Sequence, residues 1–558
     1  MAVGDLAVGS TPVGKPSTGS PERRLLSGDE AVAAGALDAG VHLGTGYPGT
    51  PSTEILEALD ALGGRAQWAP NEKVGLEVGL GAAFGGARAL VTMKHVGLNV
   101  AADPLFTAAY TGVTGGLVII AADDPGMASS QNEQDSRRYA VASGLPMLEP
   151  SDSQEAYDLT RAAYQLSEQY GLPVLLRMTT RVCHGKSIVT RRAPEVAKAP
   201  AFVRDIPGRV MIPAYARPAH LKLRKKLTDL AAGDLPGAMV ERRGSKALGV
   251  IANGVSVLHA REAAPEASLL ALKLIHPLPL ERLRAFAASV DRCVVVEEGD
   301  PVIADACKAA GIPVESKPEP YRFGELDVAR VRRILARDAG PEPAALKGKP
   351  PMLCEACPYH PVYAALRKHD CIVAGDIGCY TLGVLPPYHG MDTCVAMGAS
   401  LGVGLGLRHV LPEHEARRVV SLIGDSTFVH SGINGVVEMV YNPPPTGHVL
   451  VVLDNGTTAM TGQQEHPGTG RTLDHAATTQ VSIEGVARAL GVKNVDVIDP
   501  VKDPAGFEAL LVDRLGKREL SVIVSRRPCI LAAADIRKYE QQNAAASACA
   551  GCAAAGEG

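Results

Sequence analysis

The chain has 558 residues, and its 56 lysines and arginines nearly balance 60 aspartates and glutamates, for a formal net charge of −4. This length implies several domains that each bury a core, and the absence of a basic stripe argues against a nucleic-acid partner. No run of about 18 apolar residues occurs, so no membrane-spanning helix is expected. The 11 cysteines, in a chain without a secretion signal, favour metal or redox use over disulfides and predict a cytoplasmic protein.

The chain begins with an expected flexible arm, residues 1–27, which lacks the features of a signal peptide. A first α/β block, residues 28–196, alternates apolar strands such as GLVIIAADD with alanine-rich helices. In HLGTGYPGTPSTEILEAL we expect a strand, a turn and a helix, with Thr50 as N-cap and Pro51 at the first helical position. Thr50 is then either a simple cap or part of a site for a carboxylate.

Two charged residues of the first block are further candidates for function. Glu72 is expected at a helix start, where a carboxylate either complements the helix dipole or performs acid–base chemistry, with Glu77 one turn on as its competitor. Arg137 follows a polar loop, and it is either a solvated charge or a bidentate clamp for a carboxylate.

The rest of the chain divides at Pro- and Gly-rich stretches. We expect a connector over residues 197–245, a second α/β block over 246–339, a linker over 340–351, a third block over 352–536 and a low-complexity tail over 537–558. In the second block ALGVIANG, SLLALKLIHPLPL and CVVVEEGD are expected as successive buried strands. The predicted fold class is α/β, with three doubly wound domains and disordered termini.

The most informative stretch of the third block runs from Gly424 to Gln464. VVSLIGD is an apolar strand that ends at Asp425, and HVLVVLDN is another that ends at Asn455. Ligands of parallel α/β sheets lie at the carboxyl ends of strands, and Mg²⁺ prefers such oxygen ligands together with substrate phosphates. Gly-rich turns beside them let the backbone approach a diphosphate closely. The alternative is an ordinary βαβ crossover with polar strand ends.

Four cysteines stand beside Pro and Gly in or near the third block. Cys354 and Cys357 form a CxxC, Cys379 follows IVAGDIG, and Cys529 follows another apolar strand. Thiolates in this setting suit iron–sulfur or zinc ligation, although a CxxC alone is also typical of a redox pair.

Seven motifs in one order along the chain are YPGTPSTEI, NEKVGLEV, TMKHVGLNVAADP, SSQNEQDSR, GDIGCYTLG, DTCVAMGAS and DNGTTAMTGQQEHPGTG. With them the chain resembles the thiamine-dependent 2-oxoacid:ferredoxin oxidoreductase family, in particular the large (alpha) subunits of its indolepyruvate branch, from about Gly28 to Ile536. The resemblance implies that the three blocks are a pyrimidine-binding domain, a domain like the C-terminal domain of transketolase, and a domain that binds diphosphate.

The resemblance also implies roles for individual residues. Glu72 matches the cofactor-activating glutamate, and Thr50 and Arg137 match the contacts to the substrate carboxylate. Mg²⁺ would be bound by the Asp425 and Asn455 side chains and the Thr457 carbonyl, and thiamine diphosphate also by Gly424, Ser426 and Thr461. The four ligands of a 4Fe-4S cluster would be Cys354, Cys357, Cys379 and Cys529.

The implied reaction is oxidative decarboxylation of a 2-oxo acid, an aryl pyruvate such as indolepyruvate, to acyl-CoA and CO2, with coenzyme A as co-substrate. The implied partners are a smaller beta subunit, in a heterodimer or an (alpha-beta)2 assembly, and ferredoxin or another electron acceptor. The acceptor stays open because the family's alpha subunits end in a ferredoxin-like domain with two CxxCxxCxxxC runs, whereas only Cys549 and Cys552 stand here.

Two other interpretations use the same residues differently. A non-redox thiamine diphosphate-dependent decarboxylase or lyase would need no cluster, so its cysteines would be inert. An iron–sulfur electron-transfer subunit would keep the cysteines but would need neither Glu72 nor Asp425.

Overall fold

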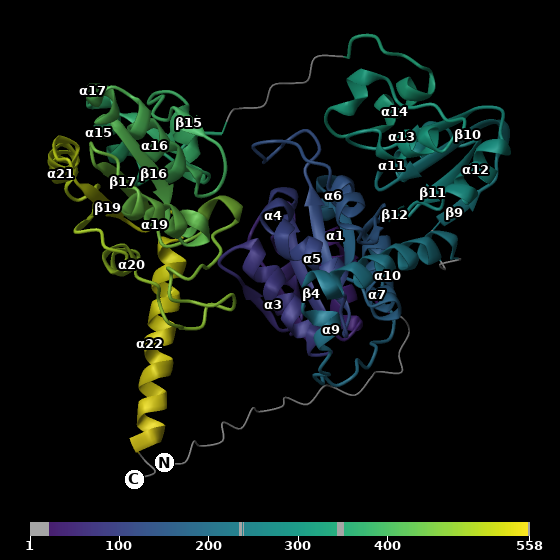
Figure 1. The fold of residues 1–558 in the computed structure, drawn as a ribbon, viewed down its shortest axis with the longest axis horizontal. Coiled ribbons are helices and arrows are strands. Elements are labelled where there is room, and N and C mark those ends of the chain that lie inside the picture. The colour runs from purple at the N-terminus through teal and green to yellow at the C-terminus, as the bar shows by residue number, and fades with distance from the viewer. Residues whose placement is uncertain (1–21, 234–236, 238, 343–350, 556–558) are drawn as a thin grey trace.

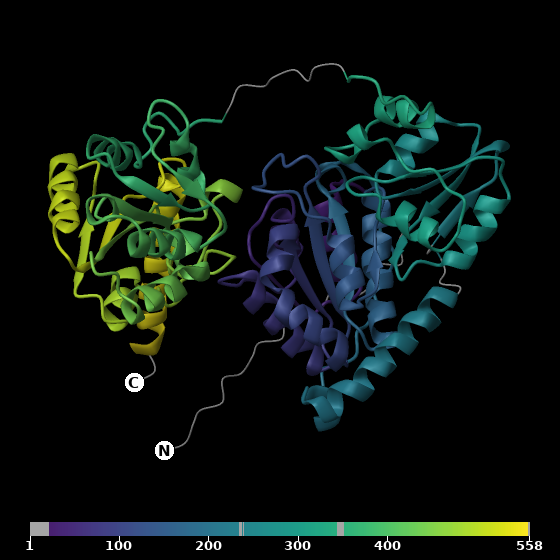
Figure 2. The same ribbon diagram turned by 45° about the horizontal axis from the view of Figure 1, so that its top comes forward.

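The computed structural model describes residues 22–233, 237, 239–342 and 351–555, with side chains to residue 544. Its three α/β blocks lie in a row, with the first block between the third and the second, and the last helix extends away from the third block (Figure 1). Figure 2 shows the same order from a second direction. Among the helices of the described residues, none is at once long and apolar enough to cross a bilayer.

The first block is built on a seven-stranded sheet in the order β12-β6-β7-β5-β4-β2-β3, in which β12 (Leu274–His276) comes from a later part of the chain. Its strands and helices are β1 (Arg23–Leu26), α1 (Gly28–Asp38), β2 (Leu43–Gly46), α2 (Glu54–Ala61), β3 (Ala66–Trp68), α3 (Glu72–Phe84), β4 (Ala89–Lys94), α4 (His95–Val100), α5 (Ala102–Thr111), β5 (Leu117–Asp123), α6 (Ser136–Ser143), β6 (Met147–Leu148), α7 (Ser153–Tyr170), β7 (Val174–Thr179), α8 (Thr180–His184) and β8 (Ser187–Thr190). The strands β2 to β7 pair in parallel.

The central strand β5 shows why the sheet needs helices on both faces. Every residue of Leu117–Asp123 is buried, as expected for a central strand of a parallel sheet. Leu117 and Ile119 enter one hydrophobic core, and Val118 and Ile120 enter the other. The first of these cores also takes in residues of the second block, so the two blocks share apolar packing.

The second block has a four-stranded sheet in the order β13-β10-β11-β9. The connector and this block contain α9 (Ile206–Arg209), α10 (Pro213–Ala232), β9 (Met239–Arg242), β10 (Ser245–Asn253), α11 (Ser256–Ala263), β11 (Ala267–Leu272), β12 (Leu274–His276), α12 (Leu280–Ala288), β13 (Cys293–Val296), α13 (Val302–Ala309), η1 (Glu319–Arg322) and α14 (Val328–Leu335). Leu223 and Leu227 pack α10 into the shared core, and α10 runs from the first block toward the second (Figure 2).

The third block has a six-stranded parallel sheet in the order β15-β14-β16-β17-β19-β18. Its elements are α15 (His360–Lys368), β14 (Ile372–Gly375), η2 (Cys379–Val384), β15 (Thr393–Cys394), α16 (Ala399–Val410), α17 (Glu413–Ala416), β16 (Val419–Gly424), α18 (Asp425–Thr427), the π-helical turn η3 (Phe428–Gly432), α19 (Ile433–Tyr441), β17 (His448–Asp454), η4 (Ala459–Thr461), α20 (Ile483–Ala489), β18 (Asn494–Ile498), α21 (Pro504–Gly516), β19 (Leu520–Arg526) and α22 (Ala533–Ala555).

Three sequence-based expectations about elements differ from the structure. The expected arm contains β1, which pairs with β8 in antiparallel fashion, while residues 1–21 lie outside the described residues. The run SLLALKLIHPLPL is not one strand, because β11 belongs to the second sheet and β12 pairs with β6 of the first. The tail was expected to be disordered, but α22 extends through it to Ala555, consistent with the high helix propensity of alanine.

Candidate active site

Two adjacent strand ends of the third block form a polar cradle. β16 and β17 pair in parallel with Gly424 opposite Leu453, so the residues that follow them lie at one edge of the sheet. Asp425 Oδ1 accepts a hydrogen bond from the Ser426 amide at 2.9 Å, and Asp425 Oδ2 accepts from the Gly456 amide at 2.8 Å. The carboxylate is thus buried and fixed by the backbone of both strand ends.

Asn455 completes the cradle on the second strand end. Its Oδ1 accepts from the Thr457 amide at 3.0 Å, and its Nδ2 donates to the Tyr359 hydroxyl at 2.6 Å. The hydroxyl of Thr461 donates to Gln464 Oε1 at 2.6 Å, which orders the loop beyond it. Asp425, Asn455 and Thr461 are thus each held by hydrogen bonds at this edge of the sheet.

A cavity of about 90 Å³ adjoins the cradle. The residues that line it come from both the first and the third block, and they include Tyr47, Pro48, Tyr359, Cys379, Tyr380, Gly424, Asp425, Ser426, Asn455, Thr457 and Thr461. A Cβ on Gly424 would lie 2.8 Å from the Tyr380 ring, so only glycine permits this close packing.

The first block reaches the cradle through the loop after β2 and the start of α3. The Tyr47 hydroxyl lies 2.7 Å from Ser426 Oγ, and Asn71 Nδ2 donates to the His430 carbonyl at 2.8 Å. Burial, with the charges of Glu72 and Asp425, raises the pKa of Tyr47 well above its ordinary value. The phenol therefore stays protonated and can donate.

Glu72 is the buried carboxylate of this interface. It is the first residue of α3, whose N-cap Asn71 accepts from the Val74 amide. Glu72 Oε2 pairs with His430 Nε2 at 2.8 Å, and His430 lies in the π-helical turn η3 that follows the cradle. Glu77, in contrast, is exposed and pairs with Lys73. Burial and position thus distinguish the two carboxylates of α3.

The four cysteines proposed from the sequence lie near one another, and Cys379 lines the cavity. Burial and the thiols of Cys354, Cys379 and Cys529 raise the pKa of Cys357 to about 11. Burial and the neighbouring thiols likewise raise the pKa of Cys379 to about 11. The Cys529 amide donates to the Asn455 carbonyl at 2.9 Å, so Cys529 lies next to a cradle residue. All four thiols are free.

Comparison with known proteins agrees with this geometry. Residues 34–227 match the thiamine diphosphate-binding domain of pyruvate flavodoxin/ferredoxin oxidoreductases, and residues 376–525 match the C-terminal thiamine pyrophosphate-binding domain of thiamine pyrophosphate enzymes. The indolepyruvate oxidoreductase subunit IorA of Archaeoglobus fulgidus is 38% identical over 563 residues, which cover 93% of this chain and 88% of that protein. The IorA subunit of Thermococcus kodakarensis is 38% identical over 91% of this chain and 86% of its own length. The chain belongs to the IorA family.

Other similarities are weaker. The 2-oxoglutarate synthase subunit KorA of Methanothermobacter marburgensis is 30% identical over 30% of this chain and 48% of its own length. The solved 2-oxoglutarate:ferredoxin oxidoreductase from Magnetococcus marinus is 17% identical with a TM-score of 0.49, over 57% of this chain and 65% of that chain.

Family membership confirms two sequence-based predictions. The resemblance drawn from the motifs is correct, and the chain is an oxidoreductase subunit with thiamine diphosphate-binding domains. The predicted α/β class with parallel sheets is also correct.

The structure places two candidate substrate contacts of this IorA-family chain away from the expected positions. Thr50 is not a helix N-cap, because α2 begins at Glu54 with Thr53 before it; Thr50 instead lies in the turn beyond Pro48, which lines the cavity. Arg137 is 1% exposed, and it donates to Asp135 and to the carbonyls of Glu298 and Asp300. Arg137 therefore lies in the contact between the first and second blocks and does not line the cavity.

Sequence reasoning missed four residues that act on the cradle. Tyr47 and His430 are described above; Tyr359 holds Asn455, and His466 Nε2 lies 3.2 Å from Asp425 Oδ2. Three weak signals existed, since Tyr47 begins the quoted motif YPGTPSTEI, Tyr359 follows the CxxC, and His466 lies in the quoted motif DNGTTAMTGQQEHPGTG.

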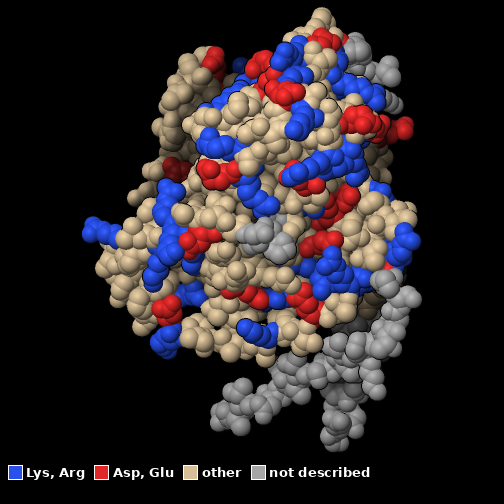
Figure 3. Space-filling view, turned by 90° about the vertical axis from the view of Figure 1, so that its right-hand side faces the viewer, with Lys and Arg blue, Asp and Glu red and all other residues tan. Residues whose placement is uncertain are grey.

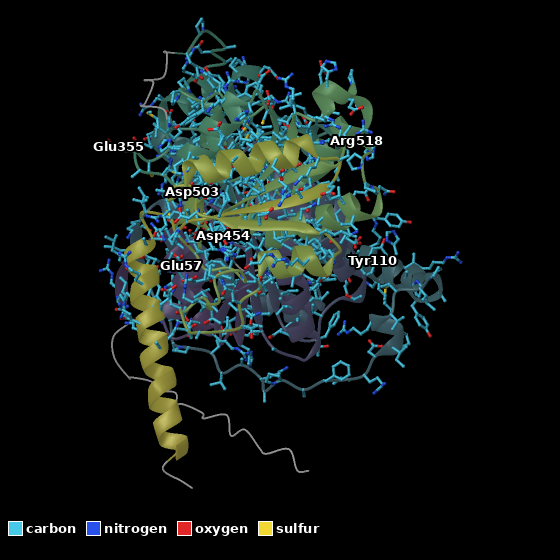
Figure 4. The ribbon with its side chains drawn as sticks, turned by 90° about the vertical axis from the view of Figure 1, so that its left-hand side faces the viewer. Glu57, Tyr110, Glu355, Asp454, Asp503 and Arg518 are labelled. Atoms are coloured by element: carbon cyan, nitrogen blue, oxygen red, sulfur yellow. The ribbon has the colours of Figure 1, made fainter. Side chains whose placement is uncertain are left out.

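A second, larger cavity of about 410 Å³ meets the cradle at Thr457. Glu57 of the first block and Ile536 and Tyr539 of α22 line it, and Figure 4 shows Glu57 beside this helix. Gln464 Nε2 donates to Glu57 Oε1 at 2.8 Å, which adds another polar link between the blocks. On the face in Figure 3 the acidic and basic side chains are interspersed.

Proposed function

We propose that this chain is the catalytic alpha subunit of an enzyme that oxidatively decarboxylates aryl pyruvates such as indolepyruvate. In this reaction the 2-oxo acid and coenzyme A give acyl-CoA, CO2, one proton and two electrons. The observation that carries the proposal is the contact of Glu72 with His430. Glu72 is a buried carboxylate of the first block, and His430 lies in the turn η3 that follows the cradle of the third block. The names of the IorA relatives supply the substrate class.

The cradle residues fit thiamine diphosphate and Mg²⁺. We propose that Asp425, Asn455 and the Thr457 carbonyl bind the metal ion, because they offer buried hard oxygens at one sheet edge. Gly424, Ser426 and Thr461 would contact the cofactor from the walls of the same cavity. When bound, thiamine diphosphate supplies the nucleophilic carbon and the electron sink for decarboxylation.

Glu72 would hold and transfer a proton at the buried interface. His430 pairs with one of its carboxylate oxygens, and Gly97 packs against the other side, so the carboxylate has little freedom to move. General acid–base groups act best when they are held within hydrogen-bond reach of the reacting proton. Thr50, in the turn beside the cavity, remains a predicted contact to the substrate carboxylate.

The thiols of Cys354, Cys357, Cys379 and Cys529 fit a 4Fe-4S cluster. All four are free, the thiols of Cys354, Cys379 and Cys529 lie close enough to Cys357 to raise its pKa, and the four come from three separate segments of the chain. A cluster bound there would accept single electrons beside the reaction site. Cys549 and Cys552 lie outside the residues with described side chains.

We further propose that the chain works with a smaller beta subunit, in a heterodimer or an (alpha-beta)2 assembly, because its relatives are themselves named as subunits. Ferredoxin or another acceptor would take the electrons. Nine free cysteines among the described residues suit the reducing cytoplasm, where we place the protein.

The test compares Glu72→Gln with Glu77→Gln in the enzyme produced with its small subunit. Glu72→Gln should retain thiamine diphosphate but lose about 10²- to 10⁴-fold in coenzyme A-dependent turnover of indolepyruvate, since glutamine cannot share the proton. Glu77→Gln, on the exposed side of the same helix, should behave as the unaltered enzyme. Equal turnover in both variants would refute the proposal.

A further inference from the structure

A cluster of ligand-type side chains lies in the first block among the starts of two helices and the end of a third. Asp29 is in the first turn of α1, Glu54 begins α2, and His184 ends α8. One ligand atom of each residue lies within 4.8 Å of the ligand atoms of the other two. Asp29 is buried, whereas Glu54 and His184 are exposed, so the cluster opens to solvent on one side.

Asp29 is buried, and no ion pair among the described residues offsets its charge. It is 1% exposed, and among the described residues neither of its carboxylate oxygens has a hydrogen-bond partner. The described ion pairs include none to Asp29 or Glu54. Capping does not require Asp29 either, because Ser27 and Glu30 already form a capping box at the start of α1. A buried carboxylate without compensation is costly, so a proton or a cation must complete this cluster.

The charges that face Asp29 favour a cation. Its neighbours are the carboxylates of Glu54 and Glu30 and the buried thiol of Cys183. Glu30 has a basic partner, Lys186, at 3.8 Å.

We propose that Asp29, Glu54 and His184 bind a divalent transition-metal ion of the Zn²⁺ type. Two carboxylates and one imidazole form a donor set suited to such an ion, and three protein ligands leave one position for water. The exposed Glu54 and His184 provide the entry path. The ion would bind the starts of α1 and α2 to the end of α8, and α2 follows directly on the turn that carries Tyr47 and Thr50.

The experiment measures Zn²⁺ binding to the purified full-length chain by equilibrium dialysis and mass spectrometry, with iron counted in every sample. Zinc also binds thiolates, so the comparison is made between variants that all keep Cys354, Cys357, Cys379 and Cys529. Asp29→Asn, Glu54→Gln and His184→Gln each remove one proposed ligand. Glu30→Gln is the matched control, since it lies beside Asp29 and glutamine still serves in a capping box.

The unaltered chain and Glu30→Gln should bind about one zinc ion per chain more than the three ligand variants. The Kd for zinc of the three ligand variants should rise at least about tenfold, because even the loss of a residue that only contacts a metal ligand typically weakens metal binding by that factor. If Asp29→Asn does not fold, the exposed Glu54→Gln and His184→Gln variants decide. Equal zinc content in all samples would overturn the proposal. If Asp29→Asn is also more stable than the unaltered chain while its zinc content is unchanged, Asp29 and Glu54 form a carboxyl pair that shares a proton instead of binding a metal ion.

Discussion

Gly97 packs against Glu72, so a substitution at Gly97 can displace the Glu72 carboxylate while Glu72 itself stays unchanged. An alanine Cβ at position 97 would lie 2.6 Å from Glu72 Cγ and Oε1. Ordinary contact begins at 3.4 Å, so the Glu72 side chain would have to retreat by about 0.8 Å. Gly97 lies within helix α4, where alanine is favoured over glycine by roughly 0.5–1 kcal/mol. The substitution should therefore disturb the site and not the helix.

Gly97→Ala should lower turnover by about 100-fold, the typical effect of a misplacement near 1 Å. The assay is 2-oxo acid-dependent reduction of benzyl viologen by the complex with the small subunit, with Tm measured in parallel. Gly81→Ala in α3 is the control, because its Cβ would meet no atom within 4 Å. Full turnover in Gly97→Ala would refute our account of Glu72, and a large drop in Tm would assign the loss to folding instead.

Three further outcomes follow from the geometry. Asp425→Ala should lose Mg²⁺-dependent retention of thiamine diphosphate in equilibrium dialysis, since one of few hard ligands is removed; normal retention would exclude the assignment. Cys379→Ser should lose the iron of the anaerobically purified protein, whereas Cys371→Ala, in the hydrophobic core of the third block, should keep it; the opposite pattern would move the cluster elsewhere. Burial raises the pKa of Glu298 from 4.5 to about 7. Between these two pH values the folded state holds a proton that the unfolded state releases, so the stability of the folded state falls as pH rises from about 4.5 to about 7. Glu298→Gln should remove this fall and be more stable at pH 8 by on the order of 3 kcal/mol in thermal unfolding; a pH dependence like that of the unaltered protein would contradict this.

The cradle could be predicted from sequence because its geometry is local. Asp425 and Asn455 each follow an apolar strand, and neighbouring parallel strands bring their carboxyl ends together. The partners of these residues could not be predicted in the same way. His430 meets Glu72 from 358 positions away, and Tyr359 meets Asn455 from 96 positions away. Only the packed fold brings such pairs into contact.

The division of SLLALKLIHPLPL between two sheets shows a second limit. An apolar run indicates that a segment is buried, but it does not say against which sheet. Here the chain turns at Lys273, whose carbonyl accepts from the Glu149 amide and whose ammonium pairs with Glu155 at 2.7 Å. Both partners belong to the first block, so β12 is added to its sheet.

Arg137 shows how tertiary contacts decide between adjacent residues of one type. Its guanidinium pairs with Asp135 and with Glu297 of the second block, next to Arg177, which donates to Asp123 at 2.6 Å. Breaking a buried pair of this kind typically costs about 3–5 kcal/mol, because the remaining charge is left uncompensated. An arginine held in this way stabilises the contact between the two blocks and is not free to close on a substrate. The next residue along the chain, Arg138, has a side chain that is 57% exposed. Which of the two arginines turns inward depends on acidic residues some 160 positions away, and a motif of nine residues contains no information about them.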